Sequence, residues 1–370
     1  MVNNDPQPYA IGFSQSVAEF FRDAARLKWR NPAAAAFIVQ TAAHQQRAVQ
    51  RRAHWESLGI HVPPAIILSV THRCNLQCKG CYAHAQHRPA DEELSLERMD
   101  RLLTEAHDLG VSIVVLAGGE PLTRTGVLDV AAGHPAIIFP MFTNGLLLDD
   151  ATVEALARAR NIIPVLSIEG GQAETDARRG PGVYARLQSA MERLRRRGVL
   201  FGASLTLTRS NFDAATDRAF TAGLHDQGAR VFFWLDYVPI QCGTDDLTLT
   251  PELVEREKVL LADYRRDLAA LFVGFPSDEE VWGGCLASGR GFVHISPSGA
   301  LEPCPASPVS DASVADGTLR EALASPLLRA LRESGLQHEE GRGGCALWDK
   351  REQVAELVAS LAAPGHAPSP

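Results

Sequence analysis

The chain has 370 residues, of which 45% are hydrophobic, and its formal net charge at pH 7 is −8. This length accommodates two domains, or one large domain with an addition, and the composition is typical of a protein that buries a sizeable core. The acidic balance argues against nucleic acid as an obligate partner, because a duplex-binding protein normally presents a basic surface.

The first 63 residues are predicted to form a helical cap. Apolar residues recur at helical spacing from Val17 to Leu27, Asn31-Pro32 interrupts the pattern, and a second helix is predicted from Ala33 to Arg52. This second helix is locally basic. A solvated basic face is favoured, and a surface that contacts an anionic membrane or an acidic partner stays open as the alternative. We expect no signal peptide and no transmembrane segment.

Residues 64–240 alternate between strand-like and helix-like runs, which predicts βα units around a parallel sheet. The predicted strands cover residues 66–70, 112–117, 136–142, 162–168, 200–206 and 230–238. The predicted helices include residues 94–107, with Ser95 as the N-cap, 183–197 and 212–226. Six such units would form an α/β partial barrel, (βα)6 and TIM-like, open on one side. In parallel barrels the functional groups gather at the C-terminal ends of the strands.

Three cysteines, Cys74, Cys78 and Cys81, follow the first predicted strand. Their close spacing belongs to a compact loop, which can bring three sulfurs around one soft metal centre. A zinc site would usually need four ligands in two short-spaced pairs, and no second pair follows here. Three thiolates would leave one position of a four-iron cluster open.

This C-x3-C-x2-C pattern, with the aromatic Tyr82 beside the last cysteine, resembles the signature of the radical S-adenosylmethionine (radical SAM) enzymes. The resemblance implies a 4Fe-4S cluster whose unligated iron binds S-adenosylmethionine. Reductive cleavage would give methionine and a 5′-deoxyadenosyl radical, which abstracts hydrogen from a substrate. Tyr82 is expected to pack near the adenine, and Leu76 to shield the cluster from water. An electron donor such as flavodoxin or ferredoxin is expected as a partner.

Further fragments at the predicted strand ends extend the resemblance. Gly118-Gly119-Glu120 looks like the GGE element of the family, whose backbone contacts the methionine amino group, and Glu120 is expected to help fix that end. Ser167 and Glu169 lie where the family places polar contacts to the ribose hydroxyls.

Two more residues are candidates for cofactor binding. Asn144 follows the third predicted strand, although an Asn-Gly pair is also a common turn. Arg178 lies in an Asp…Arg-Gly stretch similar to one in related enzymes with accessory clusters. An arginine at the barrel mouth could hold a carboxylate of the methionine or of the substrate, and a solvated loop charge is the alternative.

A second cysteine group follows a long predicted helix at residues 251–271. Cys285 and Cys304 flank a predicted hairpin whose turn is Pro297-Ser298-Gly299, and Cys345 lies downstream. The pattern C-x13-G-x4-C resembles the opening element of the SPASM and twitch auxiliary-cluster domains.

The resemblance implies a small α+β domain at residues 241–370 with one auxiliary 4Fe-4S cluster on Cys285, Cys304 and Cys345. Its fourth ligand is left open between Cys242, another side chain and none. Three structural cysteines or a zinc site remain the alternatives for this group. The chain has seven cysteines, an odd number, and they are grouped in the sequence like metal ligands. Both features favour a reduced cytoplasm over a secreted disulfide framework.

Taken together, the motifs predict a radical SAM enzyme whose substrate is a small metabolite, a cofactor precursor, a lipid or a peptide. No winged-helix module for peptide recognition is apparent. The alternatives are a non-catalytic iron–sulfur electron-transfer protein and a zinc-stabilised binding protein. No Ser–His–Asp arrangement or phosphate loop supports a hydrolase or kinase. Four histidines are predicted to be surface or loop residues: His72, His84, His87 and His294.

Overall fold

The computed structural model describes residues 32–86, 93–337 and 345–362. One sheet runs through the molecule in the order β10-β9-β8-β1-β2-β3-β4-β5-β6-β7. Its strands are β1 Ala65–Thr71, β2 Ile113–Gly118, β3 Phe139–Thr143, β4 Ile162–Ser167, β5 Phe201–Leu207, β6 Ala229–Asp236, β7 Leu271–Phe275, β8 Phe292–Ile295, β9 Ala300–Glu302 and β10 Ala312–Ser313. Neighbours from β8 to β7 are parallel, whereas β8–β9 and β9–β10 are antiparallel.

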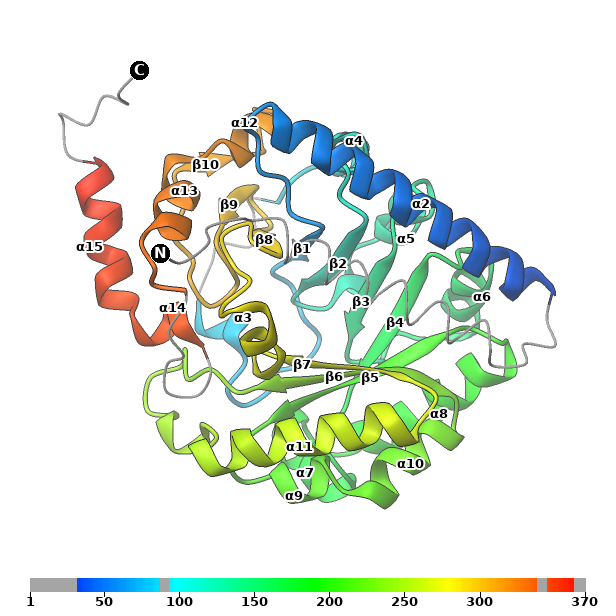
Figure 1. Ribbon diagram of the computed structural model, residues 1–370. Helices are drawn as coiled ribbons and strands as arrows, with labels where there is room; N and C mark the ends of the chain where they lie inside the picture. The colour runs from blue at the N-terminus through cyan, green and yellow to red at the C-terminus, as the bar shows by residue number, and fades with distance from the viewer. Residues whose placement is uncertain (1–31, 87–92, 338–344, 363–370) are drawn as a thin grey trace.

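The helices are α2 Pro32–Ser57, α3 Tyr82–Ala85, α4 Leu96–Leu109, α5 Val127–Ala132, α6 Asp150–Arg158, α7 Gln172–Arg179, α8 Val183–Arg196, α9 Phe212–Ala215, α10 Arg218–Asp226, α11 Pro251–Asp267, α12 Leu319–Leu323, α13 Pro326–Glu333, α14 Ala346–Asp349 and α15 Arg351–Ala362. Short 3₁₀ helices are η1 Pro121–Thr123, η2 Asp245–Leu247 and η3 Ser277–Trp282. The sheet is curved, and α4, α5, α6, α8, α10 and α11 lie along its outer side (Figure 1).

The two faces of the sheet bury two different apolar clusters. In β1, Ile66 and Leu68 pack in the large cluster that includes Met99 of α4. Ala65 of the same strand belongs to a second cluster, which also contains Cys285 and Cys304. Since side chains alternate along a strand, the large cluster fills the space between sheet and helices, and the second lies on the opposite face.

The sequence prediction of a partial α/β barrel is confirmed, and each of the six predicted strands is present within a few residues of its expected ends. Ser95 caps α4 as predicted, because its side chain accepts a hydrogen bond from Arg98 N. The helix predicted over residues 212–226 is divided, because Asp217 caps a new helix within it.

A further parallel strand, β7, was not predicted. The helix expected over residues 251–271 ends at Asp267, and Leu271–Phe275 then pairs with β6. The predicted hairpin of β8 and β9 is present, and β8 also pairs with β1. The hydrogen-bonded sheet therefore extends beyond residue 240. The division into domains at residues 63 and 240 stays a prediction.

The basic residues of the cap helix α2 pack against α4 instead of forming a solvated face. Arg51 donates to His107 O at 2.7 Å, and the buried Arg52 donates to Gly110 O at 2.5 Å. Both oxygens lie at the C-terminal end of α4, where the helix dipole favours positive charge. The prediction of a solvated basic face is therefore wrong for these two residues, because tertiary contacts use their charge.

The helix predicted before Asn31, and the expectation about a signal peptide, concern residues 1–31 and lie outside the described residues. In the ranges that the structure describes, no helix combines the length and hydropathy needed to cross a membrane.

A buried pair of carboxyl groups joins the sheet to α11. Asp236 ends β6, Glu257 lies on α11, and Ser277 Oγ donates to Glu257 Oε1 at 2.9 Å. Burial, and then the charge of Glu257, raises the pKa of Asp236, and burial raises the pKa of Glu257 to about 7.

This pair predicts that the protein loses stability as the pH rises. An acid whose pKa is higher in the folded than in the unfolded state stabilises the fold below the unfolded pKa, and that contribution is lost as the pH rises through the folded pKa. For Glu257 the window runs from its ordinary pKa of 4.5 to about 7. The loss is about 3 kcal/mol. Urea unfolding at several pH values measures it.

Glu257→Gln is expected to flatten this pH dependence, because the buried amide does not ionise. Glu255→Gln is the matched control, since Glu255 is an exposed residue of the same helix. Equal pH dependence in the two variants would show that the buried pair does not cause the effect.

Candidate functional site

The cysteine loop leaves the C-terminal end of β1 and packs against the glycine turn that follows β2. Gly119 N donates to Thr71 O at 2.8 Å, and Glu120 N donates to Arg73 O at 2.9 Å. The approach is so close that a Cβ atom on Gly119 would overlap Arg73 O, and Gly118 has a φ of +108°. The two glycines therefore let the turn contact the chain that leads into Cys74.

The Glu120 carboxylate connects this turn to the end of β3. It is buried and accepts hydrogen bonds from Thr143 Oγ1 at 2.8 Å, Asn144 N at 2.7 Å and Leu122 N at 3.2 Å. Burial raises the pKa of Glu120, whereas these hydrogen bonds act in the opposite direction. Both carboxylate oxygens have protein partners, so Glu120 fixes the geometry of the turn. Its predicted contact with methionine stays a prediction.

Asn144 contacts the cysteine loop directly. Its Nδ2 donates to Asn75 Oδ1 at 2.7 Å and lies 3.9 Å from Cys74 Sγ. The side chain therefore links the end of β3 to the first cysteine and is more than part of a local turn. Burial raises the pKa of Cys74, although its hydrogen bond with the Leu76 backbone opposes this.

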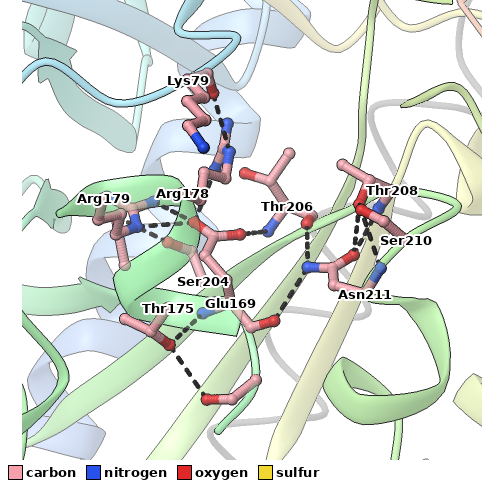
Figure 2. A network of polar contacts seen from close by, with 12 residues as sticks. Lys79, Glu169, Thr175, Arg178, Arg179, Ser204, Thr206, Thr208, Ser210 and Asn211 are labelled. Carbon is pink, nitrogen blue, oxygen red and sulfur yellow. Dashed lines mark hydrogen bonds and ion pairs between the residues drawn. The ribbon is translucent and has the colours of Figure 1, made fainter. Parts of the chain in front are cut away.

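Glu169, directly after β4, is the centre of a polar network (Figure 2). The residue is fully buried, and its Oε1 accepts from Arg178 at 2.6 Å and from Arg179 at 2.7 Å. Its Oε2 accepts from Thr206 N at 3.2 Å. A buried carboxylate with two guanidinium partners and a backbone donor is a strongly held group.

The network extends into the cysteine loop. Lys79 N donates to Arg178 O at 2.9 Å, and Arg178 Nε donates to Lys79 O at 3.2 Å. Arg178 is therefore not a solvated loop charge, because α7 binds the loop between Cys78 and Cys81. Burial raises the pKa of Cys78, and the charges of Arg179 and Arg178 act against this, which favours the thiolate form that a metal requires.

Sequence reasoning missed two members of this network. Arg179 is the second guanidinium on Glu169, and Asn211 Nδ2 donates to Glu169 O at 2.9 Å and to Thr206 O at 3.0 Å. A polar residue shortly after a strand was the available signal for Asn211. Ser167, a predicted ribose contact, is buried and accepts a hydrogen bond from Ser204 Oγ at 3.1 Å.

The network predicts that Glu169→Gln weakens the fold and the cysteine loop together. Replacing the carboxylate leaves two partly buried guanidinium groups without a charged partner, and we expect a loss of about 3 kcal/mol in the free energy of unfolding. Glu192→Gln is the control, because exposed Glu192 pairs with Arg195 and Arg196 on the surface. Its loss should be much smaller, because ion pairs on the surface contribute little to stability. Urea unfolding measures both, and equal losses would contradict the prediction.

The second cysteine group is brought together by the hairpin and the end of the chain. Cys285 and Cys304 are buried, and Cys345 caps α14. Ser288 N donates to Pro303 O at 3.1 Å, and this hydrogen bond joins the loop after Cys285 to the residue before Cys304. Burial raises the pKa of all three thiols, and the charge of Cys345 further raises the pKa of both Cys285 and Cys304. Cys285 and Cys304 belong to one apolar cluster with Ala346, the residue after Cys345, so the three cysteines lie in the same region of the fold.

All seven cysteines are free, and Cys242 is exposed. Both candidate groups thus offer three thiols on loops without a disulfide, which is the donor set that an iron–sulfur cluster needs. Within the described ranges, no three His, Cys, Asp or Glu side chains are arranged around a single metal ion.

The prediction for His294 is wrong. His294 lies in β8 and is buried, with Nδ1 at 2.7 Å from Glu302 Oε2 and Nε2 at 2.8 Å from Ser69 Oγ. It is interior because β8 is added to the sheet beside β1. His72 and His84 are partly exposed, and His87 lies outside the described residues. Tyr82 begins α3 and is partly exposed.

Comparison with known proteins shows what the chain is similar to. The family model of the Radical SAM superfamily matches residues 68–211, which contain the cysteine loop, the glycine turn and the Glu169 network. The AdoMet-dependent heme synthase of Methanosarcina barkeri is 26% identical over 80% of this chain and 91% of that protein. The PqqA peptide cyclase of Rhodopseudomonas palustris is 28% identical over 65% of this chain and 69% of that protein.

The fold agrees with a solved structure of SuiB from Streptococcus suis bound to S-adenosylmethionine. The TM-score is 0.63, with 20% identity over 78% of this chain and 72% of that chain. The sequence prediction of the family is thereby confirmed. Residues 68–211 are a radical SAM domain, and the chain is an enzyme that uses a 4Fe-4S cluster and S-adenosylmethionine for radical chemistry.

Proposed function

We propose that Cys74, Cys78 and Cys81 hold the 4Fe-4S cluster at which S-adenosylmethionine is reductively cleaved. The observation that carries this proposal is the convergence of three strand ends on one loop. The glycine turn after β2, Asn144 after β3 and the Glu169 network after β4 all contact the chain around these cysteines. When bound, the cluster supplies the electron that splits the sulfonium into methionine and a 5′-deoxyadenosyl radical.

The chain's own residues position this chemistry. The closely packed backbone of Gly118 and Gly119 contacts the methionine end of S-adenosylmethionine, and Glu120 holds that turn in place. Ser167 and Glu169 lie at the end of β4 and bind the ribose hydroxyls. Arg178, which donates to Glu169, binds a carboxylate of the methionine or of the substrate. Tyr82 covers the adenine side. Leu76 packs against the apolar core and limits water at the loop.

We also propose one auxiliary cluster on Cys285, Cys304 and Cys345, and an external one-electron donor of the flavodoxin or ferredoxin type. Cys285 and Cys304 are buried in one apolar cluster with Ala346, the residue after Cys345, which suits a group that must be kept from water. Free thiols throughout the chain favour a reduced, cytoplasmic location.

For the substrate, we propose a peptide from which the adenosyl radical abstracts hydrogen. Similarity to the R. palustris PqqA peptide cyclase favours this class. A tetrapyrrole is the second candidate, because similarity to the M. barkeri heme synthase extends over 91% of that protein.

Anaerobically reconstituted protein tests the proposal. About eight irons per chain, with 5′-deoxyadenosine formed from S-adenosylmethionine and a strong reductant, would support both clusters. About four irons with activity would remove the auxiliary cluster, and zinc without iron would favour a zinc-stabilised binding protein. Iron without 5′-deoxyadenosine would favour an electron-transfer protein. Deuterium transfer from labelled peptides or porphyrins into 5′-deoxyadenosine would identify the substrate class.

A further inference from the structure

The side chain of Tyr237 packs against the first cysteine loop from the end of β6. Tyr237 directly follows β6 and is 3% exposed, and its backbone N donates to Leu207 O of β5 at 2.9 Å. A Cβ atom added to Gly80 would lie 2.6 Å from Tyr237 Oη and 2.8 Å from Tyr237 Cε2. The aromatic ring therefore occupies the space that a side chain at position 80 would need, and only glycine allows this approach.

The place of Gly80 in the sequence makes this contact part of the candidate metal site. Lys79 and Gly80 are the two residues between the second and third cysteines of the loop. Lys79 is bound to α7, because its N donates to Arg178 O and its O accepts from Arg178 Nε (Figure 2). Tyr237 contacts the other residue of the pair. The segment that separates these two cysteines is thus held by α7 and by the end of β6.

The ring of Tyr237 is itself fixed in place. Its Oη donates to Thr244 Oγ1 at 2.8 Å, and Thr244 Oγ1 donates to Gln241 O at 2.6 Å. The backbone of Tyr237 is bonded to β5, and its hydroxyl is bonded to the segment before η2. A side chain held at both ends restricts the movement of a loop that it contacts.

We propose that Tyr237 is a positioning residue for the iron–sulfur site. Its ring keeps Cys78 and Cys81 at the separation that the cluster requires, and it excludes water from the side of β6. This inference rests on the cluster proposed above for the first cysteine group. It adds the end of β6 to the ends of β2, β3 and β4, which also contact the chain around these cysteines.

Removal of the ring should change two measurable properties. The loop could move into the space beside Gly80, and a displacement of about 1 Å near a reacting centre costs on the order of 100-fold in rate. Water could also enter there. Solvent exposure is one of the factors that set the potential of an iron–sulfur cluster. Because water stabilises the more negative, reduced form, the midpoint potential should become more positive.

The test uses protein in which the three cysteines of the second group are replaced by alanine, so that the remaining iron belongs to the first group. Three versions are reconstituted anaerobically: Tyr237 intact, Tyr237→Phe and Tyr237→Ala. The measurements are the iron content, the midpoint potential from a redox titration followed by EPR, and the rate of iron release to a chelator. Urea unfolding before reconstitution measures the stability of each version.

With Tyr237 intact we expect about four irons per chain. Tyr237→Phe keeps the ring beside Gly80 and should keep the same potential. Tyr237→Ala should give a more positive midpoint potential and release iron faster. Rescue of both properties by phenylalanine would show that the ring, and not the hydroxyl, positions the loop.

Tyr264→Ala is the matched control. Tyr264 is also a buried tyrosine, and its hydroxyl donates to Thr216 O at 2.8 Å. Its ring stacks on Phe272 in the large apolar cluster between the sheet and the helices. Loss of this ring should lower the free energy of unfolding, as large-to-small substitutions in a core do, without a change in the midpoint potential. A tyrosine with a purely structural role thus gives a different result from that expected for Tyr237.

A second measurement uses the chain with all seven cysteines. Gly80→Ala alone, and Tyr237→Ala alone, should each slow 5′-deoxyadenosine formation by about 100-fold. The double variant should be no slower than either single variant, because the added methyl group then meets no ring. Independent effects would instead multiply to about 10,000-fold, which would contradict the contact.

The possible failures are distinguishable. The same potential and iron release for Tyr237→Ala as for the protein with Tyr237 intact would show that Tyr237 does not position the site, while the cluster stays in place. Absence of iron from the version with Tyr237 intact, when urea unfolding shows that it is folded, would remove the cluster proposed for the first group and this inference with it.

Discussion

Replacement of Cys74, Cys78 and Cys81 by alanine is expected to abolish cleavage of S-adenosylmethionine and to leave about half of the iron. The three thiols lie on one loop, and the auxiliary group draws its thiols from other parts of the chain. Loss of the first group should therefore not remove the second. Iron analysis and 5′-deoxyadenosine assays after anaerobic reconstitution measure the two effects separately.

The reciprocal variant is the control for this result. Replacement of Cys285, Cys304 and Cys345 by alanine should spare some cofactor cleavage while it impairs turnover of the substrate. Persistence of 5′-deoxyadenosine formation in the first variant would contradict the assignment of its cysteines. Loss of all iron in both variants would instead indicate one shared site or general unfolding.

Gly119→Ala is expected to reduce cofactor cleavage by about 100-fold, because displacement of a binding element by about 1 Å costs on this order. The new Cβ would overlap Arg73 O and lie 2.7 Å from Arg73 C. Both are backbone atoms, so no side-chain rotation relieves the contact. The glycine turn must move away from the cysteine loop. Kinetics of 5′-deoxyadenosine formation, together with the binding of S-adenosylmethionine, measure the effect.

Gly223→Ala is the matched control for Gly119→Ala. Gly223 lies within α10, and no atom from outside that helix would stand within 4 Å of an added Cβ. Alanine is the better helix former by about 1 kcal/mol, so this variant should keep full activity and equal or higher stability. Equal activity of the Gly119 and Gly223 variants would show that the close packing of the turn is not needed for cofactor cleavage.

The local elements and the motifs could be predicted from the amino-acid sequence without the fold. Apolar runs such as Ile66–Val70 favour strands, and Ser95 caps its helix through a contact three residues away. The spacing of Cys74, Cys78 and Cys81 is likewise a property of one short loop. These features depend on neighbours in the chain, which is why the order of the residues was enough to specify them.

Contacts between residues that are far apart in the sequence depend instead on packing in three dimensions. Arg179 and Asn211 could not be assigned to Glu169 from spacing, because hydrogen bonds across 10 and 42 residues depend on how α7 and β5 are placed. His294 became an interior residue only when β8 joined the sheet beside β1. Such contacts depend on long-range packing, which the local propensities of the residues do not encode.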